Sequence, residues 1–110
     1  MKACFEVHNA LGPCFSERIY ENALAIELEL KGIIVERQKW IEVLYKNRKV
    51  GKYKLDVVIE GKVLLELKAR MDLDKVFQAQ VFSYLKASGL KLGVQVNFGR
   101  PRVEYKRVVF

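Results

Sequence analysis

Three charged residues on two neighbouring predicted strands have the types and the spacing that metal-assisted chemistry needs. Asp56 lies on the first strand, and Glu66 and Lys68 lie on the second. Side chains two residues apart on a strand share a face, so Glu66 and Lys68 bring a carboxylate and an ammonium to one centre. Mg²⁺ or Mn²⁺ prefers such carboxylate oxygens, and the Leu67 carbonyl can add another ligand. A nearby lysine can orient or deprotonate a water or stabilise negative charge, as phosphodiester hydrolysis requires.

Two polar residues on the next predicted helix extend this pattern. Gln80 and Tyr84 are four residues apart, so both can face one groove and hydrogen-bond a water or a phosphate. A simpler alternative makes Tyr84 part of the apolar stripe of its helix and Gln80 a surface residue.

A salt bridge on a solvent-exposed face is the competing interpretation of Glu66 and Lys68. The strand at residues 63–69 is otherwise apolar, which is typical of a strand in the centre of a sheet. Asp56 likewise interrupts an apolar run at 55–59. Charges in such strands tend to be paired, ligated or functional, which favours a site over a surface pair.

The turn between the two strands should bring the two acids together. Glu60-Gly61-Lys62 reads as a tight hairpin, and Asp56 and Glu66 each lie five residues from its centre. The two residues are then level across the hairpin, with Cβ atoms about 4.5–5.5 Å apart. A divalent cation can bridge carboxylates at that separation.

The remaining periodicities predict the elements that position these residues. The expected helices cover 5–11, 16–31 and 74–88, the expected strands 35–45, 53–59, 63–69, 92–98 and 103–109, and further turns 47–48 and 99–101. Ser16 is the expected cap of the second helix, whose outer face should carry Glu21, Glu27, Glu29 and Lys31. This order predicts an α/β fold with a mixed central sheet flanked by helices. A crossover through 74–88 can place strands 63–69 and 92–98 parallel.

Length and composition indicate one compact domain spanning residues 1–110. No apolar run approaches the roughly 20 residues of a membrane helix, so we expect a soluble, cytoplasmic protein without membrane contact. Residues 1–45 carry five Lys/Arg against seven Glu, whereas 46–110 carry fifteen Lys/Arg against six Asp/Glu. This basic part favours nucleic acid as a partner. A basic surface that only confers solubility is the alternative.

Two cysteines in a Cys-poor chain favour a reducing compartment. Cys4, His8 and Cys14 lack a fourth zinc ligand and fit no finger spacing, so we expect small buried side chains near a helix instead.

Five segments carry a likeness to known sequences: the stretch from Leu11 to Tyr20, Tyr53–Asp56, Leu65–Ala69, Ala79–Leu85 and Asn97–Gly99. Together they resemble the GxxExxY protein family, which is placed in the PD-(D/E)XK nuclease superfamily. The match runs over nearly the whole chain. It departs from the family where Cys14 replaces the first glycine of the naming motif and where Leu55 replaces the proline of the superfamily name.

This resemblance implies a restriction-endonuclease-like core and a set of site residues. Asp56, Glu66 and Lys68 would fill the catalytic positions of the superfamily. Glu17 would join the metal site, and Tyr20, one helical turn away, would brace it. An alternative for Glu17 is favourable placement near a helix N-terminus. Gln80 and Tyr84 look like the Gln-x-x-x-Tyr helix of RecB-like exonucleases.

The expected activity is therefore Mg²⁺- or Mn²⁺-dependent hydrolysis of nucleic acid, with DNA as the expected substrate. Candidates for contacts to the nucleic-acid backbone are Lys52, Lys54, Arg70, Lys75, Arg100 and Arg102. Two alternatives stay open: a binding or scaffold module that does not cut, and a subunit whose specificity comes from a partner chain. Pairing with a second copy also stays open.

Overall fold

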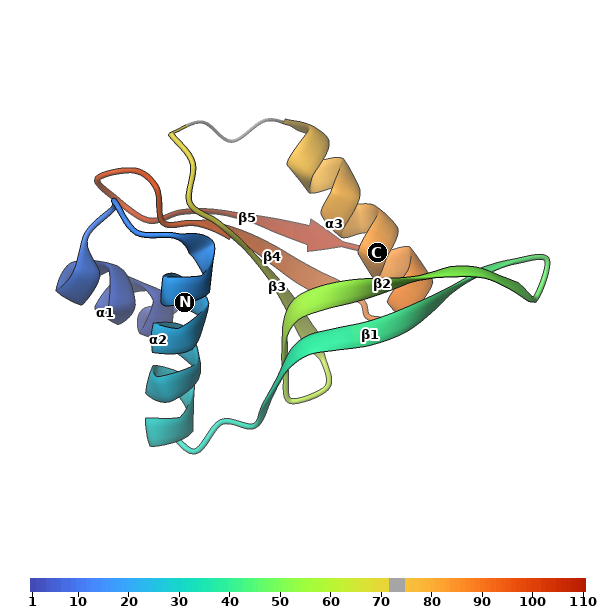
Figure 1. Ribbon diagram of the computed structural model, residues 1–110, viewed down its shortest axis with the longest axis horizontal. Coiled ribbons are helices and arrows are strands. Elements are labelled where there is room, and N and C mark those ends of the chain that lie inside the picture. Colours follow the sequence, from blue (N-terminus) through green and yellow to red (C-terminus); the bar gives the residue numbers. More distant parts are fainter. Residues whose placement is uncertain (72–74) are drawn as a thin grey trace.

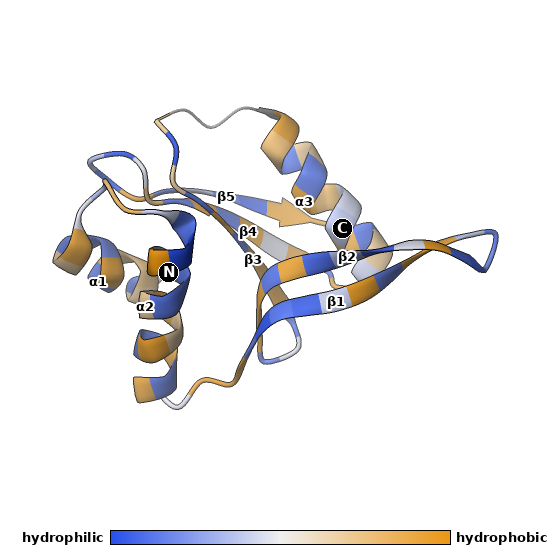
Figure 2. Cartoon of the chain, viewed as in Figure 1, coloured by the Kyte–Doolittle hydropathy of each residue, from blue (hydrophilic) through white to orange (hydrophobic). Residues whose placement is uncertain are grey.

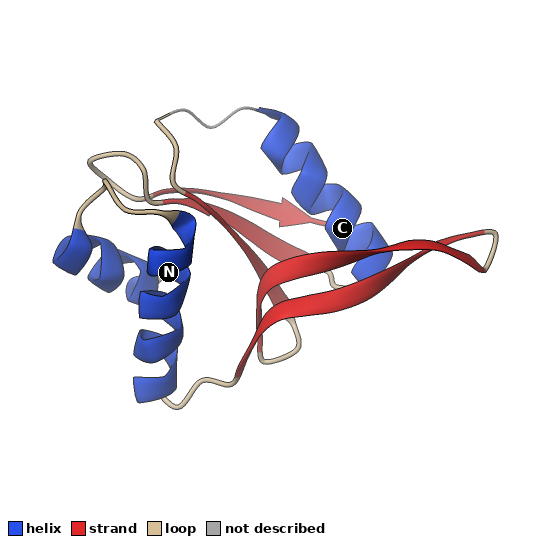
Figure 3. Ribbon diagram, viewed as in Figure 1, coloured by secondary structure: helices blue, strands red, loops and turns tan. Residues whose placement is uncertain are grey.

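The helices and strands follow the predicted order (Figures 1 and 3). The computed structural model describes residues 1–71 and 75–110. Its elements are α1 (Lys2–Leu11), α2 (Glu17–Leu30), β1 (Val35–Tyr45), β2 (Arg48–Ile59), β3 (Val63–Lys68), α3 (Lys75–Ser88), β4 (Leu92–Asn97) and β5 (Glu104–Val109). Residue 74, where the third helix was expected to begin, and the side chain of Lys75 lie outside the description.

The strands form one mixed sheet in the order β1-β2-β3-β4-β5. Neighbours pair antiparallel except for β3 and β4, which are parallel from Val63↔Leu92 to Lys68↔Asn97. The crossover through α3 that the sequence predicts is therefore confirmed. β3 lies in the centre of the sheet, as the apolar sequence of that strand indicates.

Helices cover both faces of this sheet (Figure 1). On one face, Tyr20, Leu24 and Leu28 of α2 pack with residues such as Leu65 and Leu67 of β3. On the other face, Val81 and Leu85 of α3 pack on a second apolar cluster formed by Leu55, Val58 and Leu64. Alternating residues of β3 thus face opposite helical layers, which places Glu66 and Lys68 on the α3 side.

The alternation of β2 breaks at Asp56. Leu55 belongs to the cluster under α3, whereas Val57 belongs to the cluster under α1 and α2, although residues two apart normally share a face. On β1, Gln38 stands opposite this break with a positive φ of 52°. We call the hairpin beyond the break, residues 39–54, the arm. Figure 1 shows the arm projecting past α3.

Three local predictions need correction. The turn at the end of the arm lies at Lys46 and Asn47, both with positive φ, one residue before the predicted turn, and β2 begins at Arg48 instead of Tyr53. Positive φ at both central residues suits a tight two-residue hairpin, so the strands extend to the turn. Cys14 is exposed, whereas Cys4 is buried as expected, and burial raises the pKa of its thiol to about 11.

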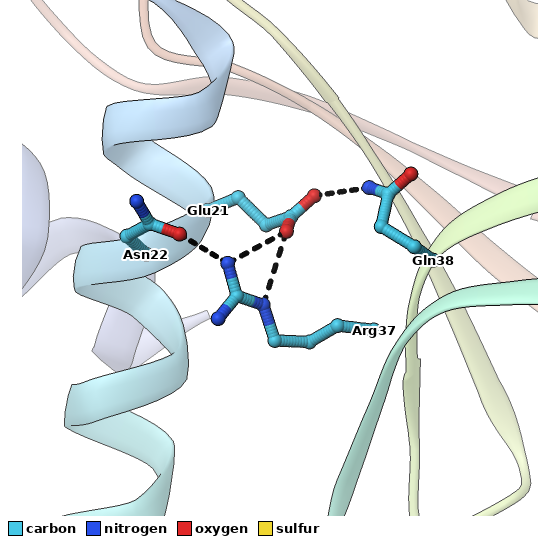
Figure 4. Close-up of polar contacts among 4 residues, drawn as sticks. All are labelled: Glu21, Asn22, Arg37 and Gln38. Carbon is cyan, nitrogen blue, oxygen red and sulfur yellow. Dashed lines mark hydrogen bonds and ion pairs between the residues drawn. The ribbon is translucent and has the colours of Figure 1, made fainter.

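The prediction for the outer face of α2 is wrong for Glu21, which is only 4% exposed. Its carboxylate accepts hydrogen bonds from Nε and Nη2 of Arg37 at 3.0 and 2.8 Å, and from the Gln38 amide (Figure 4). Arg37 also donates to Asn22. The buried charge is therefore paired and ties α2 to β1 at the break in the sheet. Ser16 occupies the N-cap position, but its side chain makes no capping hydrogen bond.

Candidate active site

The two predicted acids lie where β2 and β3 stop pairing through their backbones. The ladder runs from Ile59↔Val63 to Val57↔Leu65, so Asp56 stands opposite Glu66, as the hairpin predicts. Side-chain bonds replace the ladder at this point. Leu67 N–H donates to Oδ2 of Asp56 at 3.0 Å, and Asp56 N–H lies 3.4 Å from Oε1 of Glu66. Each carboxylate therefore contacts the backbone of the opposite strand, and the two acids lie together.

Glu66 is held in an environment that disfavours its charge. The residue is 5% exposed, and burial, followed by repulsion from Asp56, raises its pKa to about 8. Lys68 opposes this shift only weakly. A cation placed between the two carboxylates would remove the repulsion and favour the ionised form of Glu66.

The backbone of Leu67 faces the same place. The N–H and C=O of one residue in a strand point to the same neighbouring strand. The carbonyl of Lys68 points toward the β4 side and accepts a hydrogen bond from Phe98 N–H at 2.8 Å. The N–H of the preceding residue, Leu67, points the other way and donates to Asp56 on β2. The carbonyl of Leu67 is therefore directed toward the β2 side, where a cation ligand is expected. The side chain of Leu67 is buried in the opposite core.

An aromatic ring on α3 contacts two basic side chains at the C-terminal end of β3. Nζ of Lys68 lies 4.7 Å from the ring centroid of Phe77, and Cζ of Arg70 lies 5.1 Å from it. Such cation–π contacts stabilise charge at the surface by about 0.5–1 kcal/mol. Sequence reasoning missed these contacts, because Lys68 and Arg70 lie outside the helix that carries Phe77.

Asn97 fixes the chain as it leaves β3. Its Oδ1 accepts from Arg70 N–H at 2.9 Å and from Gly99 N–H at 3.1 Å, and its Nδ2 donates to the Arg70 carbonyl at 2.8 Å. A Cβ at Gly99 would lie 2.3 Å from the Arg70 nitrogen, so only glycine fits there. The Asn97–Gly99 segment that carries part of the family resemblance thus positions the end of β3.

Glu17 begins α2 and lies within electrostatic reach of the two strands. Partial loss of hydration raises its pKa, the Asp56 carboxylate adds to this, and Lys68 and Arg70 oppose it. Glu17 nevertheless counts among the exposed residues. The structure therefore places it at the rim of the site.

The predicted bracing of Glu17 by Tyr20 is not what the described residues show. The hydroxyl of Tyr20 donates to the Gly12 carbonyl and accepts from Phe15 N–H at 3.1 Å. Its ring stacks on Phe98 with centroids 4.6 Å apart. Tyr20 thus ties the loop before α2 to Phe98, the residue that follows β4.

Tyr84 and Gln80 differ in their surroundings. The Tyr84 hydroxyl donates to the Tyr53 hydroxyl at 2.6 Å, and the two rings stack at 4.2 Å. Burial raises the pKa of Tyr84, and Tyr53, Glu66 and Asp56 add to the shift. Gln80 is half-buried, and its side chain has no hydrogen bond to another described residue. Tyr84 therefore joins α3 to the base of the arm near the acids, and the amide of Gln80 is available to a ligand.

A buried amide beside Glu66 was missed by sequence reasoning. Gln95 is the register partner of Glu66 on β4 and is fully buried. Within the described part of the chain, neither its Nε2 nor its Oε1 has a hydrogen-bond partner. A single glutamine in a strand does not indicate a site, and Gln95 lies beside Glu66 only because β3 and β4 pair in parallel.

The donor set fits a hard divalent cation. Across residues 1–71 and 75–110, no group of three or more His, Cys, Asp or Glu side chains is close enough to hold a metal. Mg²⁺ commonly uses only one or two carboxylates and completes its coordination with water and substrate phosphates. Two facing carboxylates with a raised glutamate pKa, and a backbone carbonyl on the β2 side of β3, meet that requirement.

A mixed five-stranded sheet with helices on both faces, and acids where β2 and β3 part, is the restriction-endonuclease-like α/β fold that the sequence predicts. A family model for the PD-(D/E)XK nuclease superfamily matches residues 1–108. The chain belongs to that superfamily.

Comparison with solved structures gives the same fold. The crystal structure of SSO0001 matches with a TM-score of 0.66 and 16% identity, over 84% of this chain and 48% of that chain. The chain thus spans about half the length of that protein. No curated protein matched the sequence. The helices in the described residues are too short or too polar to cross a bilayer.

Proposed function

We propose that the protein is a metal-dependent nuclease that hydrolyses phosphodiester bonds of DNA. The observation that carries this proposal is the buried Glu66 carboxylate, which faces Asp56 with Lys68 on the same face of β3. Mg²⁺ or Mn²⁺ would be held by Asp56, Glu66 and the Leu67 carbonyl, with Glu17 assisting from the rim. When bound, the cation would neutralise charge at the scissile phosphate and lower the pKa of a water.

The other side chains have roles that follow from their positions. Lys68 would orient or deprotonate the attacking water or stabilise the charge that develops on the phosphate. Gln80, whose amide has no described partner, would hydrogen-bond water or a phosphate oxygen. Tyr84 is already bonded to Tyr53, so we assign it to positioning α3 against β2.

Two finer assignments belong to the same proposal. Membership of the GxxExxY family is supported by the five segments that resemble it, including Asn97–Gly99, in which a Cβ at Gly99 would clash with the Arg70 backbone. A cytoplasmic location is supported by the free cysteines Cys4 and Cys14.

A cleavage assay tests the proposed activity directly. Purified protein is incubated with single- and double-stranded DNA and RNA in Mg²⁺, in Mn²⁺ or in chelator, alongside Lys68→Ala and the control Lys86→Ala. We expect metal-dependent cleavage of DNA that falls about 100-fold or more in Lys68→Ala and is unchanged in Lys86→Ala. Absence of cleavage under all conditions, or equal activity of the three proteins, would contradict the proposal.

The alternative of a binding module that does not cut has two observations in its favour. Glu17 stands at the rim, and no compact cluster of three acidic ligands exists in the described part of the chain. Such a module would bind nucleic acid in chelator, and Asp56→Asn would bind equally well with no cleavage in either protein.

A further inference from the structure

The arm, residues 39–54, carries most of the net charge of the chain. It contains six Lys/Arg and one Glu, so it contributes five of the seven net positive charges, while the rest of the chain holds fourteen basic and twelve acidic residues. Figure 2 shows hydrophilic residues at its tip. Such a concentration of charge on one projecting hairpin favours contact with a polyanion.

The base of the arm is fixed to the body of the protein, whereas its tip is surrounded by solvent. At the base, Ile41 packs on the cluster under α3, and Tyr53 stacks on Tyr84. Every residue from 44 to 50 is exposed. The β1–β2 pairing nevertheless continues to Tyr45↔Arg48, so the tip is an ordered two-stranded ribbon.

The face of the arm away from α3 bears an aromatic and basic platform. Trp40 is 54% exposed, and Nζ of Lys52 and Lys54 lie 4.6 and 4.9 Å from its ring centroid. Lys54 is the register partner of Trp40, so the three side chains meet across the two strands. The indole thereby holds two ammonium groups at the surface, where they can reach phosphates.

We propose that the arm binds duplex DNA, with its two-stranded tip in the major groove and its lysines on the flanking phosphates. This inference rests on the proposed function. The major groove of B-DNA, about 12 Å wide, admits a two-stranded ribbon, whereas the major groove of A-form RNA is too deep and narrow for side chains to read. Lys54 lies two residues before Asp56, so the platform is at the end of the arm nearest the acids.

Duplex binding in chelator separates the arm from the chemistry. Fluorescent duplex DNA, single-stranded DNA and duplex RNA are titrated with wild type and with Lys52→Ala/Lys54→Ala at several salt concentrations. The matched control is Lys106→Ala/Arg107→Ala, which removes the same charge from exposed positions on β5. Equal unfolding midpoints establish that all three proteins are folded.

We expect wild type to prefer duplex DNA, and the arm variant to bind about tenfold more weakly at low salt. The slope of log affinity against log salt should become shallower by about 0.9 for each phosphate that the arm variant no longer neutralises. The affinity of the control variant for duplex DNA should fall by a smaller factor. In the cleavage assay, the arm variant should raise KM and leave kcat close to wild type.

Each contrary outcome overturns the inference in a distinct way. Equal binding by wild type, arm variant and control, together with metal-dependent cleavage, would remove the arm from recognition and leave the proposed nuclease intact. A preference of wild type for single strands or RNA would refute the duplex assignment. Failure of wild type both to bind and to cleave any nucleic acid would refute the proposed function and the arm together.

Discussion

Two buried glutamates occupy opposite situations in this molecule. Glu21 meets the guanidinium of Arg37 and the amide of Gln38, so its charge is paired and its oxygens accept hydrogen bonds. Glu66 faces Asp56, and burial together with that neighbour raises its pKa to about 8. A paired buried charge joins two elements, whereas a carboxylate that faces another carboxylate has the environment of a cation site. Burial alone therefore does not distinguish structure from function; the sign of the neighbour does.

The largest expected difference between the two glutamates is in activity. Glu66→Gln removes a proposed metal ligand, and cleavage should fall at least about 100-fold. Glu21→Gln should keep most of the activity of each folded molecule, because the described partners of the Glu21 side chain, Arg37 and Gln38, both lie on β1. Initial rates normalised to the folded fraction measure this contrast. Similar losses in both variants would show that the two regions are not functionally distinct.

The second expected difference is in stability when a partner is removed. Arg37→Ala leaves Glu21 buried without its cation and should lower the free energy of unfolding by about 2 kcal/mol. The cost is below that for a fully buried pair because the Arg37 side chain is 36% exposed. Denaturant unfolding measures it. Lys39→Ala, which breaks the exposed pair with Glu36, is the control and should change stability by less than about 1 kcal/mol. Equal changes in the two variants would contradict the structural role of Arg37.

The sequence predicted the positions of Asp56 and Glu66 correctly but not the position of Glu21, because only the first two are positioned by a local element. Asp56 and Glu66 belong to one hairpin, so a turn and a period of two place them opposite each other. Glu21 was expected on the outer face of α2, because its partner Arg37 lies 16 residues away on another element. Helical periodicity describes one helix and carries no information about what approaches it.

The same limit explains what else could not be predicted. The order of helices and strands and the parallel β3–β4 pair follow from periodicity and the crossover rule. The Asn97 bonds to the Arg70 backbone and the Phe77 contact with Lys68 depend on that tertiary arrangement. The break at Asp56, which turns the side chains of β2 from one face to the other, also has no counterpart in a pattern of strict alternation.

The third difference is in how stability depends on pH without metal. The folded protein binds the Glu66 proton more tightly than the unfolded chain, because its pKa rises from 4.5 to about 8. This stabilisation is complete below about pH 4.5 and is lost as the pH rises to about 8, with a slope of at most about 1.4 kcal/mol per pH unit. Unfolding is measured in chelator for wild type and Glu66→Gln, and the difference between them should follow that slope.

Two controls make this pH dependence specific to Glu66. Glu29→Gln, at an exposed position on α2, should follow wild type across the same range. Saturating Mg²⁺ should reduce the loss of stability, because a bound cation favours the ionised carboxylate. A difference between wild type and Glu66→Gln that is constant from pH 5 to 8 would contradict the assigned environment.

The smallest expected difference concerns the glutamine beside each glutamate. The Gln38 amide donates to Glu21, whereas the Gln95 amide, next to Glu66, has no partner among the described residues. Methionine has a similar shape without the amide, so Gln38→Met should cost about 1 kcal/mol, whereas Gln95→Met should be neutral or slightly stabilising. Thermal unfolding of both variants in chelator measures the difference. An equal cost at Gln95 would mean that its amide has a partner in solution, and the polar groups around Glu66 would then be as well satisfied as those around Glu21.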